Sequence, residues 1–454
     1  MKNRHGEETG GAPTVYVVHC VDTEGPLGET LQATFQRVRH TFGVDLPPSR
    51  DTLARLQRRE LDLGGREEAV ARMVAPELLA YKDSWDKMDA MLDRIQAPEV
   101  RLALTDSLGR GWIYNWFCVD HVGYTENPRG RDMGYHRVFD HYAARCLESG
   151  NSRDAVYFHY HPMHFSRHAH RSGSHYFAHA DTLFQILARR IIDRGWFPSC
   201  NRAGFNVERP DSHWFLEQYV PFDLSNQSCH EDADQPDIAC GRYSDWQAAP
   251  RDWAPYHPHH DDHRRPGACR RWIARCLNLG TRFKLLRQAD VDQAFREAAE
   301  GRPVVLAFTD HDFREMEPDV RLAMDMLDKA SRAYGGVAFR YCTAREAMRA
   351  ALGLAEAPPL RLSIEQTLEG LDIRAQGRTF GPQPFLALKT RAGAYFHDNL
   401  DPVQPFAHWR YALYSETFAP EALESVGVAA CDALGNVAVA RLDMRDGSLR
   451  QETF

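Results

Sequence analysis

Residues 15–26 read VYVVHCVDTEGP, an apolar run that ends in two acidic side chains and a Gly-Pro turn. The β-branched residues of the run predict a buried strand. Successive side chains of a strand point to opposite faces, so Cys20, Asp22 and Glu24 are expected on one face and His19 on the other. Carboxylates are costly inside an apolar core but useful at the open end of a strand. Taken alone, the acidic stretch is more typical of a solvated surface turn.

Further strands and helices alternate along the chain. Apolar runs that predict strands lie at 100–106, 155–161, 304–310 and 336–342. Helical patterns lie at 76–95, 179–195, 289–301 and 320–335, and the last three end in glycine, a common helix stop. Strands separated by helices predict a parallel sheet or a β/α barrel, in which ligands bind at the carboxyl ends of the strands.

The chain is expected to contain two domains. Residues 14–352 carry the alternating pattern and predict the barrel, interrupted at about 226–288 by a stretch rich in Cys, Asp, Pro, Trp and His. That stretch is interpreted as an ordered insertion or a lid over the active site. After a linker, AEAPPL, residues 359–454 show short alternating strands with turn signals and predict a small antiparallel β-sandwich.

Composition and charge narrow the function. The 454 residues include 43% apolar and 26% charged residues, and the net charge of −8, without a basic stripe, argues against a nucleic-acid-binding protein. The polar start lacks the features of a signal peptide, and no long uncharged apolar run predicts a membrane span, so a cytoplasmic protein is expected. The oligomeric state is left open, a homo-oligomer included.

The ten cysteines are scattered without a CxxC pair, which fits free thiols in a reducing compartment. Cys229, Cys240, Cys269 and Cys276 lie close enough in sequence to keep a structural zinc site as an alternative.

A pair of histidines ends the strand predicted at 155–161. His159 and His161 share one face of that strand, and the following proline ends it. Two imidazoles at one strand end can bind the same cation, with the remaining ligands supplied by other elements. His164 follows three residues later and is a third candidate ligand. A lone histidine here would be more typical of a structural role.

Two more strand ends carry polar groups. The stretch FTDHDFRE closes the strand at 304–310 and puts His311 between two aspartates, an environment that suits a general acid. The stretch RAGF begins at Arg202, and an arginine there can keep a neighbouring carboxylate ionised. Each signal is weak alone, and His311 could equally lie on a surface turn.

The order of these motifs resembles the polysaccharide deacetylase superfamily (NodB homology, carbohydrate esterase family four), in a divergent bacterial branch. The motifs are DTEG, HYHP, RAGF, a D-x-S strand (FDLS) and a late histidine, and they cover roughly residues 14–350. The resemblance implies a distorted β/α barrel of the NodB type and a divalent metal, usually zinc, held by one aspartate and two histidines.

Carried over residue by residue, the resemblance implies Asp22, His159 and His161 as metal ligands, with His164 as a substitute. Arg202 matches the arginine that orients the catalytic base, and His311 matches the late histidine that protonates the leaving amine or stabilises the oxyanion.

The first motif departs from the family pattern, because Cys20 stands where a second acid is expected and a thiol is a poor base. Either Glu24 is the base beside a ligand Asp22, or Asp22 is the base and Glu24 binds the metal.

The expected activity is metal-dependent hydrolysis of an N-acyl group, acetyl or formyl, on a carbohydrate in surface-polysaccharide biosynthesis. The expected substrate is a nucleotide- or lipid-linked sugar or oligosaccharide. Trp112, Trp253 and Tyr256 are candidates for stacking on sugar rings, although aromatic core packing explains such residues equally well. The alternatives are another C–N or glycosidic hydrolase on the same fold, or a glycan-binding protein without catalysis.

Overall fold

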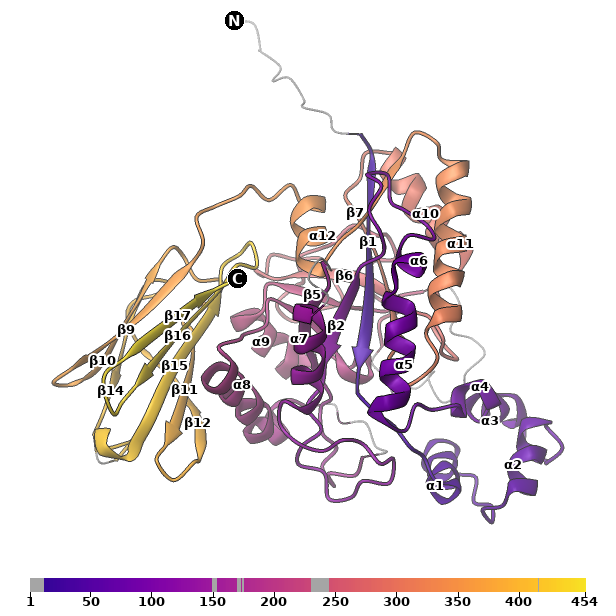
Figure 1. Ribbon diagram of the computed structural model, residues 1–454, viewed down its shortest axis with the longest axis horizontal. Coiled ribbons are helices and arrows are strands. Elements are labelled where there is room, and N and C mark those ends of the chain that lie inside the picture. The colour runs from indigo at the N-terminus through magenta and orange to yellow at the C-terminus, as the bar shows by residue number, and fades with distance from the viewer. Residues whose placement is uncertain (1–11, 149–152, 170–172, 174, 230–244, 415) are drawn as a thin grey trace, which may run out of the picture.

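A computed structural model describes residues 12–148, 153–169, 173, 175–229, 245–414 and 416–454. These residues form a parallel barrel with helices around it and, beside the barrel, two antiparallel sheets (Figure 1). The predicted β/α barrel with antiparallel strands at the C-terminus is confirmed at this level. No helix in the described part of the chain has the length and apolar character that crossing a bilayer requires.

Seven parallel strands close the barrel in the order β1 to β7, and β7 pairs with β1 again. An eighth strand, β8, pairs with residues 14–17 of β1. It lies on the same edge of β1 as β2, which pairs with the later residues 19–23. The strands are Thr14–Thr23 (β1), Tyr114–Cys118 (β2), Ala155–Tyr160 (β3), Cys200–Ala203 (β4), Phe222–Asn226 (β5), Trp272–Asn278 (β6), Val304–His311 (β7) and Ala338–Tyr341 (β8). Because the strands are parallel, their carboxyl ends form one mouth.

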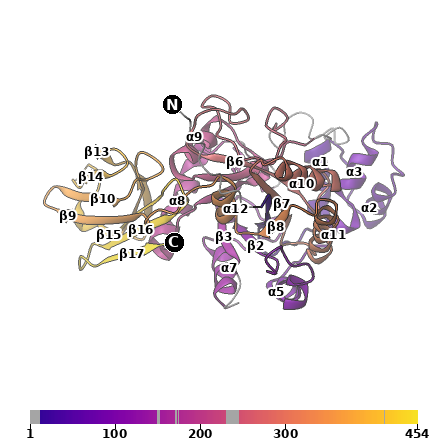
Figure 2. The ribbon, with the colours of Figure 1, turned by 90° about the horizontal axis from the view of Figure 1, so that it is seen from above.

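Helices cover the outside of the barrel and part of its mouth. The outer helices are α5 (Trp85–Gln96), α6 (Pro98–Arg101), α7 (Arg137–Glu148), α8 (Ala180–Arg194), α9 (Pro210–Tyr219), α10 (Gln288–Ala299), α11 (Glu317–Ala333) and α12 (Ala344–Ala351). A separate group follows β1 and has a small core of its own: α1 (Leu31–Phe42), α2 (Arg50–Gln57), α3 (Glu67–Met73) and α4 (Pro76–Leu79). Figure 2 shows this group at the end of the molecule opposite the C-terminal sheets.

The strand that opens the chain has the two faces that its sequence predicts. Val18 and Cys20 belong to the apolar cluster inside the barrel, together with side chains of β2 to β7. Val17 and Val21 belong to the cluster between the barrel and its outer helices. His19 is also on the outer face, 5.5 Å from the ring of Trp112. The face that carries Cys20 therefore continues to Asp22 at the barrel mouth.

The strand predicted at 100–106 is wrong. Those residues form the end of α6 and the loop after it, and the barrel strand is β2, with the sequence YNWFC. Pro98 at the first position of α6 favours a helix start, because proline needs no backbone N–H there. All five residues of β2 are buried, so the strand shows no alternation of polar and apolar side chains.

The insertion predicted at about 226–288 is also corrected, since it contains the barrel strand β6. A charged residue, Arg275, interrupts the apolar pattern of this strand. The structure shows how it is accommodated: its guanidinium lies 4.4 Å from the ring of Trp253 and donates to Asp290 at 2.9 Å. Between β5 and β6 the structure describes residues 227–229 and 245–271, and residues 230–244 lie outside the described part.

The helix predicted at 76–95 is two helices, α4 and α5. Ser84 ends the break between them, because its side chain accepts a hydrogen bond from Lys87 N and caps α5. The other three predicted helices are confirmed as α8, α10 and α11. Gly195, with φ of 63°, ends α8 as predicted.

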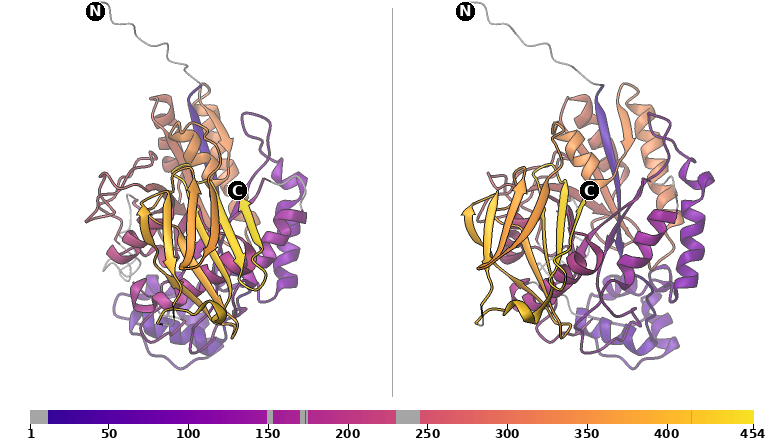
Figure 3. Two further views of the ribbon diagram at one scale, coloured as in Figure 1. Left: turned by 90° about the vertical axis from the view of Figure 1, so that its left-hand side faces the viewer. Right: turned by 60° about the vertical axis from the view of Figure 1, so that its left-hand side comes forward.

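Two antiparallel sheets follow the linker. One has the order β13-β14-β10-β9 and the other the order β12-β11-β15-β16-β17. Their strands are Arg361–Thr367 (β9), Gly370–Gln376 (β10), Phe385–Thr390 (β11), Tyr395–Asp398 (β12), Asp401–Gln404 (β13), His408–Ala412 (β14), Leu423–Cys431 (β15), Val437–Asp443 (β16) and Leu449–Thr453 (β17). Apolar side chains of both sheets form one cluster, as in a β-sandwich. Seen from their side, these strands lie in front of the barrel (Figure 3).

Helix α8 joins the barrel to the sheets. Apolar side chains of α8 and of β11, β15 and β16 belong to one buried cluster. Ile191 lies against Gly427 of β15, where an added Cβ would come within 2.6 Å of the Ile191 Cγ2 atom. Glycine therefore allows the helix to approach the sheet closely, and Ile191 fills the contact.

We predict that Ile191→Ala lowers the free energy of unfolding by about 2 to 5 kcal/mol, because it leaves a cavity in this buried contact. Leu322→Ala is the matched control, since Leu322 is 50% exposed on α11 and its truncation should cost less than about 0.5 kcal/mol. Urea unfolding followed by tryptophan fluorescence measures both. Equal unfolding midpoints for the two variants would show that the contact contributes nothing.

Candidate metal centre

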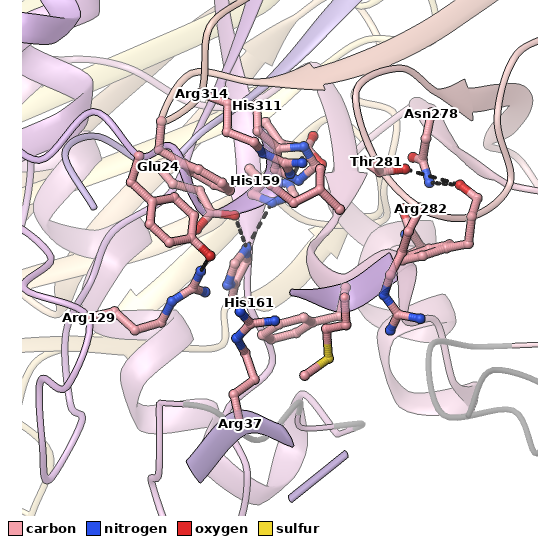
Figure 4. Close-up of a pocket in the computed structure, with 18 of the residues that line it drawn as sticks. Glu24, Arg37, Arg129, His159, His161, Asn278, Thr281, Arg282, His311 and Arg314 are labelled. Atoms are coloured by element: carbon pink, nitrogen blue, oxygen red, sulfur yellow. Dashed lines mark hydrogen bonds and ion pairs between the residues drawn. The ribbon is translucent and has the colours of Figure 1, made fainter. Parts of the chain in front are cut away.

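The mouth of the barrel contains a cavity of about 210 Å³. The strand ends predicted to carry polar groups all reach it, through Asp22, His159, Arg202 and His311. Side chains of α1, α3 and α4 line it from the other side. Figure 4 shows the labelled side chains of this cavity.

Three buried side chains at the mouth bring ligand atoms together. Glu24, His159 and His161 each offer one such atom, and the three atoms lie within 4.8 Å of one another. The two Nε2 atoms of the histidines are 3.0 Å apart, and His161 Nε2 is 3.5 Å from a carboxylate oxygen of Glu24. This is the one group of three or more ligand-type residues within the described ranges.

Hydrogen bonding fixes the tautomer of the first histidine. His159 Nδ1 lies 2.8 Å from the backbone carbonyl of Arg202. A carbonyl only accepts, so Nδ1 carries the proton and Nε2 presents a lone pair to the cavity. A carbonyl partner of this kind is typical of histidines that bind metals. The ring of His161 is held by Phe205, at 4.5 Å between ring centroids.

The geometry and charge of this group fit a divalent cation. Tetrahedral zinc with Zn–N distances of about 2.0 to 2.1 Å would hold two nitrogens about 3.3 Å apart, close to the separation of the two imidazoles. Burial, with smaller contributions from His159 and Arg131, holds the pKa of His161 well below its ordinary value. The imidazole is therefore neutral at pH 7, which is the form that binds metal ions.

Glu24 is held as a carboxylate. Burial alone would favour its protonated form, but the ion pair with Arg131 and the neighbouring histidines hold its pKa well below the ordinary value. His121 Nε2 donates to the Glu24 carbonyl at 2.8 Å, with Arg131 beside it at 3.2 Å. The carboxylate is thus ionised and aimed at the histidine pair.

The turn that carries Glu24 is clamped from another strand. Asp312, just past β7, accepts hydrogen bonds at 2.9 Å from the backbone amides of both Glu24 and Gly25. Gly25 has φ of 71°, and a Cβ there would meet Val138 and Trp85 at 3.1 and 3.2 Å. Glycine is therefore required at this position, and the clamp fixes where the carboxylate of Glu24 lies.

Asp22 lies beside the histidine pair without joining the group. Its carboxylate accepts from Arg202 Nε at 2.6 Å, and its other oxygen lies 3.7 Å from His311 Nε2. Burial raises the pKa of Asp22, but the charge of Arg202, followed by His159 and His311, more than offsets this and lowers it. The nearest atom of His159, at 3.8 Å, is Nδ1, which already donates to a carbonyl. Of the two assignments that the sequence left open, the geometry favours Glu24 as ligand and Asp22 as base.

His311 faces the cavity as a neutral imidazole. Burial lowers its pKa to about 3, with Arg314 adding to the effect. Its Nδ1 atom is buried and has no hydrogen-bond partner in the described structure, while Nε2 faces Asp22. The residue can therefore hold or pass on a proton at Nε2.

Four predicted site residues lie elsewhere. His164 is on the loop after β3, where Pro162 has ended the strand, and its Nδ1 contacts Ser166 at 2.8 Å. The aromatic candidates are buried and do not line the cavity, so they cannot stack on a sugar there. Their polar atoms bind inside the protein: Trp112 donates to His19, Trp253 to the Asp290 carbonyl, and Tyr256 to the His263 carbonyl.

The cysteine candidates do not form a metal group among the described residues. Cys276 lies inside the barrel and forms a hydrogen bond with Cys20. Cys269 lies 4.0 Å from His213, while Cys240 is outside the described residues. Burial raises the pKa of Cys20 well above its ordinary value, so this thiol is neutral and does not replace a carboxylate.

Apart from Arg202, sequence reasoning missed the arginines of the site. Arg131 lies in the loop after β2, where Asn127 binds both the backbone amide and the carbonyl of Arg131. The stretch ENPRGRDM indicates a turn but not which carboxylate it would meet. Helices α1 to α4, which contribute Arg37 to the cavity, were also not predicted as part of the site.

Comparisons of the chain with protein-family models, with curated proteins and with solved structures find no match.

We predict that purified protein binds one divalent cation per chain through the Glu24, His159 and His161 group. His159→Ala or His161→Ala should weaken zinc affinity at least about 100-fold, because each removes a ligand. His164→Ala is the matched control and should keep the cation. Elemental mass spectrometry and titration against a competing chelator measure stoichiometry and affinity. Unchanged affinity in the first two variants would rule out this group as the site.

Proposed function

We propose that the protein is a metal-dependent hydrolase that removes an N-acyl group, acetyl or formyl, from a carbohydrate. The single observation that carries the proposal is the buried group of Glu24, His159 and His161, with Asp22 and His311 beside it in one cavity. The motif order that resembles the polysaccharide deacetylases supports the substrate class. The proposed substrate is a nucleotide- or lipid-linked sugar or oligosaccharide of surface-polysaccharide biosynthesis.

Glu24, His159 and His161 would hold the metal, with zinc as the first candidate. A divalent cation bound there would lower the pKa of a water molecule and polarise the acyl carbonyl. Side chains of the protein itself carry out all the other steps.

Asp22 is the proposed general base. Its low pKa, set chiefly by Arg202 against the effect of burial, keeps it ionised and able to accept a proton from water. Arg202 orients it, because the guanidinium is fixed by Thr309 at 3.1 Å as well as by the Asp22 carboxylate. The base therefore has one orientation, with its second oxygen turned toward His311.

His311 is the proposed proton donor to the leaving nitrogen. It is neutral before reaction, so the proton that it delivers must first reach it. Asp22 Oδ2 lies 3.7 Å from His311 Nε2, so the proton taken from water can pass between them once the two atoms close to hydrogen-bond distance. The pair thus moves one proton from the nucleophile to the departing amine in each turnover.

We predict that metal-loaded protein releases acetate or formate from N-acylated sugars. Asp22→Asn should lower turnover by at least about 100-fold while metal content stays unchanged, because only the base is lost. Asp325→Asn, on the exposed face of α11, is the matched control and should keep full activity. Enzymatic detection of free acetate or formate measures the rate.

Full turnover in Asp22→Asn would refute the role of this carboxylate. If metal-loaded protein bound N-acyl sugars but released no acid from any of them, a glycan-binding protein without catalysis would be the better account.

A further inference from the structure

The cavity carries more positive charge than the proposed hydrolysis needs. Six of its lining residues are arginines, and two, Asp22 and Glu24, are carboxylates. The arginines are Arg37, Arg129, Arg131, Arg202, Arg282 and Arg314. The formal excess of four is reduced by Glu29, a buried carboxylate behind the wall that binds Arg37 through two hydrogen bonds of 2.9 Å. A neutral N-acyl sugar gives no reason for arginines beyond the two that pair with Asp22 and Glu24, and a bound cation would add to the positive charge.

Within the part of the chain that the structure describes, two of these arginines have N–H groups without an acceptor. Arg131 and Arg202 are occupied by Glu24 and Asp22. Arg314, by contrast, has no carboxylate within 4.0 Å among the described residues; one of its terminal nitrogens donates to the Gly280 carbonyl, and its buried Nε has no partner there.

The second such arginine is Arg129. Its Nε lies 3.5 Å from Glu29 without a hydrogen bond and is likewise an unsatisfied buried donor. A terminal nitrogen donates to the Tyr81 hydroxyl at a long 3.4 Å. Buried donors without acceptors are costly, so these two groups are suited to an anion that enters the cavity.

The carboxyl groups near Arg314 accept no hydrogen bond from it among the described residues. Burial together with Asp319 raises the pKa of Asp310, on β7, well above its ordinary value. Burial also raises the pKa of Asp319, to about 6. The pair therefore carries about one negative charge at pH 7, but it leaves the buried Nε of Arg314 without an acceptor.

Arg314 lies where the cavity meets a second, larger space. The cavity adjoins a larger groove of about 720 Å³ between α2 to α4 and the loops after β6 and β7. Four residues line both spaces: Leu78, Thr281, Arg282 and Arg314. Figure 4 shows Arg314 close to His311. In the same view, Arg129 and the Arg282 loop lie on opposite sides of Glu24. A group bound at Arg314 would therefore lie between the metal centre and the groove.

We infer that Arg129 and Arg314 form a subsite for a phosphoryl group of the substrate. The substrate is then an N-acyl sugar phosphate or diphosphate, with the acyl group in the cavity and the rest of the molecule in the groove. Guanidinium groups pair with phosphate through charge-assisted hydrogen bonds, and two guanidinium groups with unsatisfied donors fit one multivalent anion. The identity of the acyl sugar depends on the proposed function, whereas the anion subsite can be tested without it.

The test is calorimetric titration of chelator-treated protein with inorganic pyrophosphate, so that no bound metal competes for the anion. The double variant Arg129→Gln and Arg314→Gln should bind pyrophosphate at least about 10-fold more weakly than the parent protein, and the parent affinity should fall with added salt. Arg332→Gln is the matched control, because Arg332 lies on the outer side of α11 with its side chain 78% exposed. Unchanged zinc affinity confirms that the double variant is folded. Equal pyrophosphate affinity in the double variant and the control would overturn the subsite.

The KM values of metal-loaded protein for different N-acyl sugars then identify the substrate class. N-acetylglucosamine 1-phosphate and uridine diphosphate N-acetylglucosamine should both be hydrolysed with a lower KM than N-acetylglucosamine, and the double variant should lose that difference. A lower KM for the nucleotide than for the sugar phosphate assigns the groove to the nucleoside, and the reverse assigns it to another carrier. Acyl release with no effect of the arginines refutes the subsite alone, whereas pyrophosphate binding without acyl release from any sugar refutes the proposed function alone.

Discussion

One buried arginine connects the strands that build the site. The Arg202 guanidinium on β4 binds Asp22 of β1 and Thr309 of β7, and it reaches the Leu224 carbonyl of β5 at 3.4 Å. Its own carbonyl accepts from His159 on β3. An arginine fully buried at the barrel mouth is tolerated because its Nε has two acceptors, Asp22 and Thr309, its Nη1 has the Leu224 carbonyl, and Asp22 balances its charge. The same contacts set the ionisation of Asp22 and the tautomer of His159, so the electrostatics of the site depend on this residue.

The period of two along a strand explains which residues meet at the mouth. Because β1 presents Val18, Cys20 and Asp22 to the interior, only every second residue can take part in the site. The closed barrel then sets the level of each residue: the strand register aligns Asp22 with His311 and His159 with Arg202. The hydrogen bond from Arg202 to Asp22 joins the two pairs, so four residues far apart in sequence meet at the mouth without any loop having to bring them together.

This regularity is also why part of the site could be predicted from sequence. Asp22, His159 and His311 each close an apolar run, and a residue in that position of a parallel barrel lies at the mouth, whereas Arg202 was indicated only by the RAGF motif. The missed elements lack such a signal. The strand β2 has the sequence YNWFC, and β6 carries Arg275, which is accommodated only by Trp253 and Asp290 from other segments. The aromatic candidates failed for a related reason, since a tryptophan in a core and one that binds a sugar have the same local sequence. Contacts such as Arg131 with Glu24 arise between loops whose sequences do not indicate each other.

The place of Cys20 follows from the same geometry. A residue two positions earlier on β1 lies roughly 6.6 Å deeper in the barrel, at about 3.3 Å per residue. At that depth Cys20 packs among apolar side chains and against Cys276, where an ionised carboxylate would have no water and no free arginine. Two residues further along the chain, Glu24 forms an ion pair with Arg131. At the same point the strand ends, where Asp312 accepts a hydrogen bond from the backbone amide of Glu24. The two carboxylates therefore occupy successive levels at the mouth, Asp22 beside His159 and His311 and Glu24 beside His161. His159 near the end of β3 and His161 just after it repeat this spacing, so each acid has an imidazole near its own level. A cysteine at position 20 therefore takes no carboxylate away from the site.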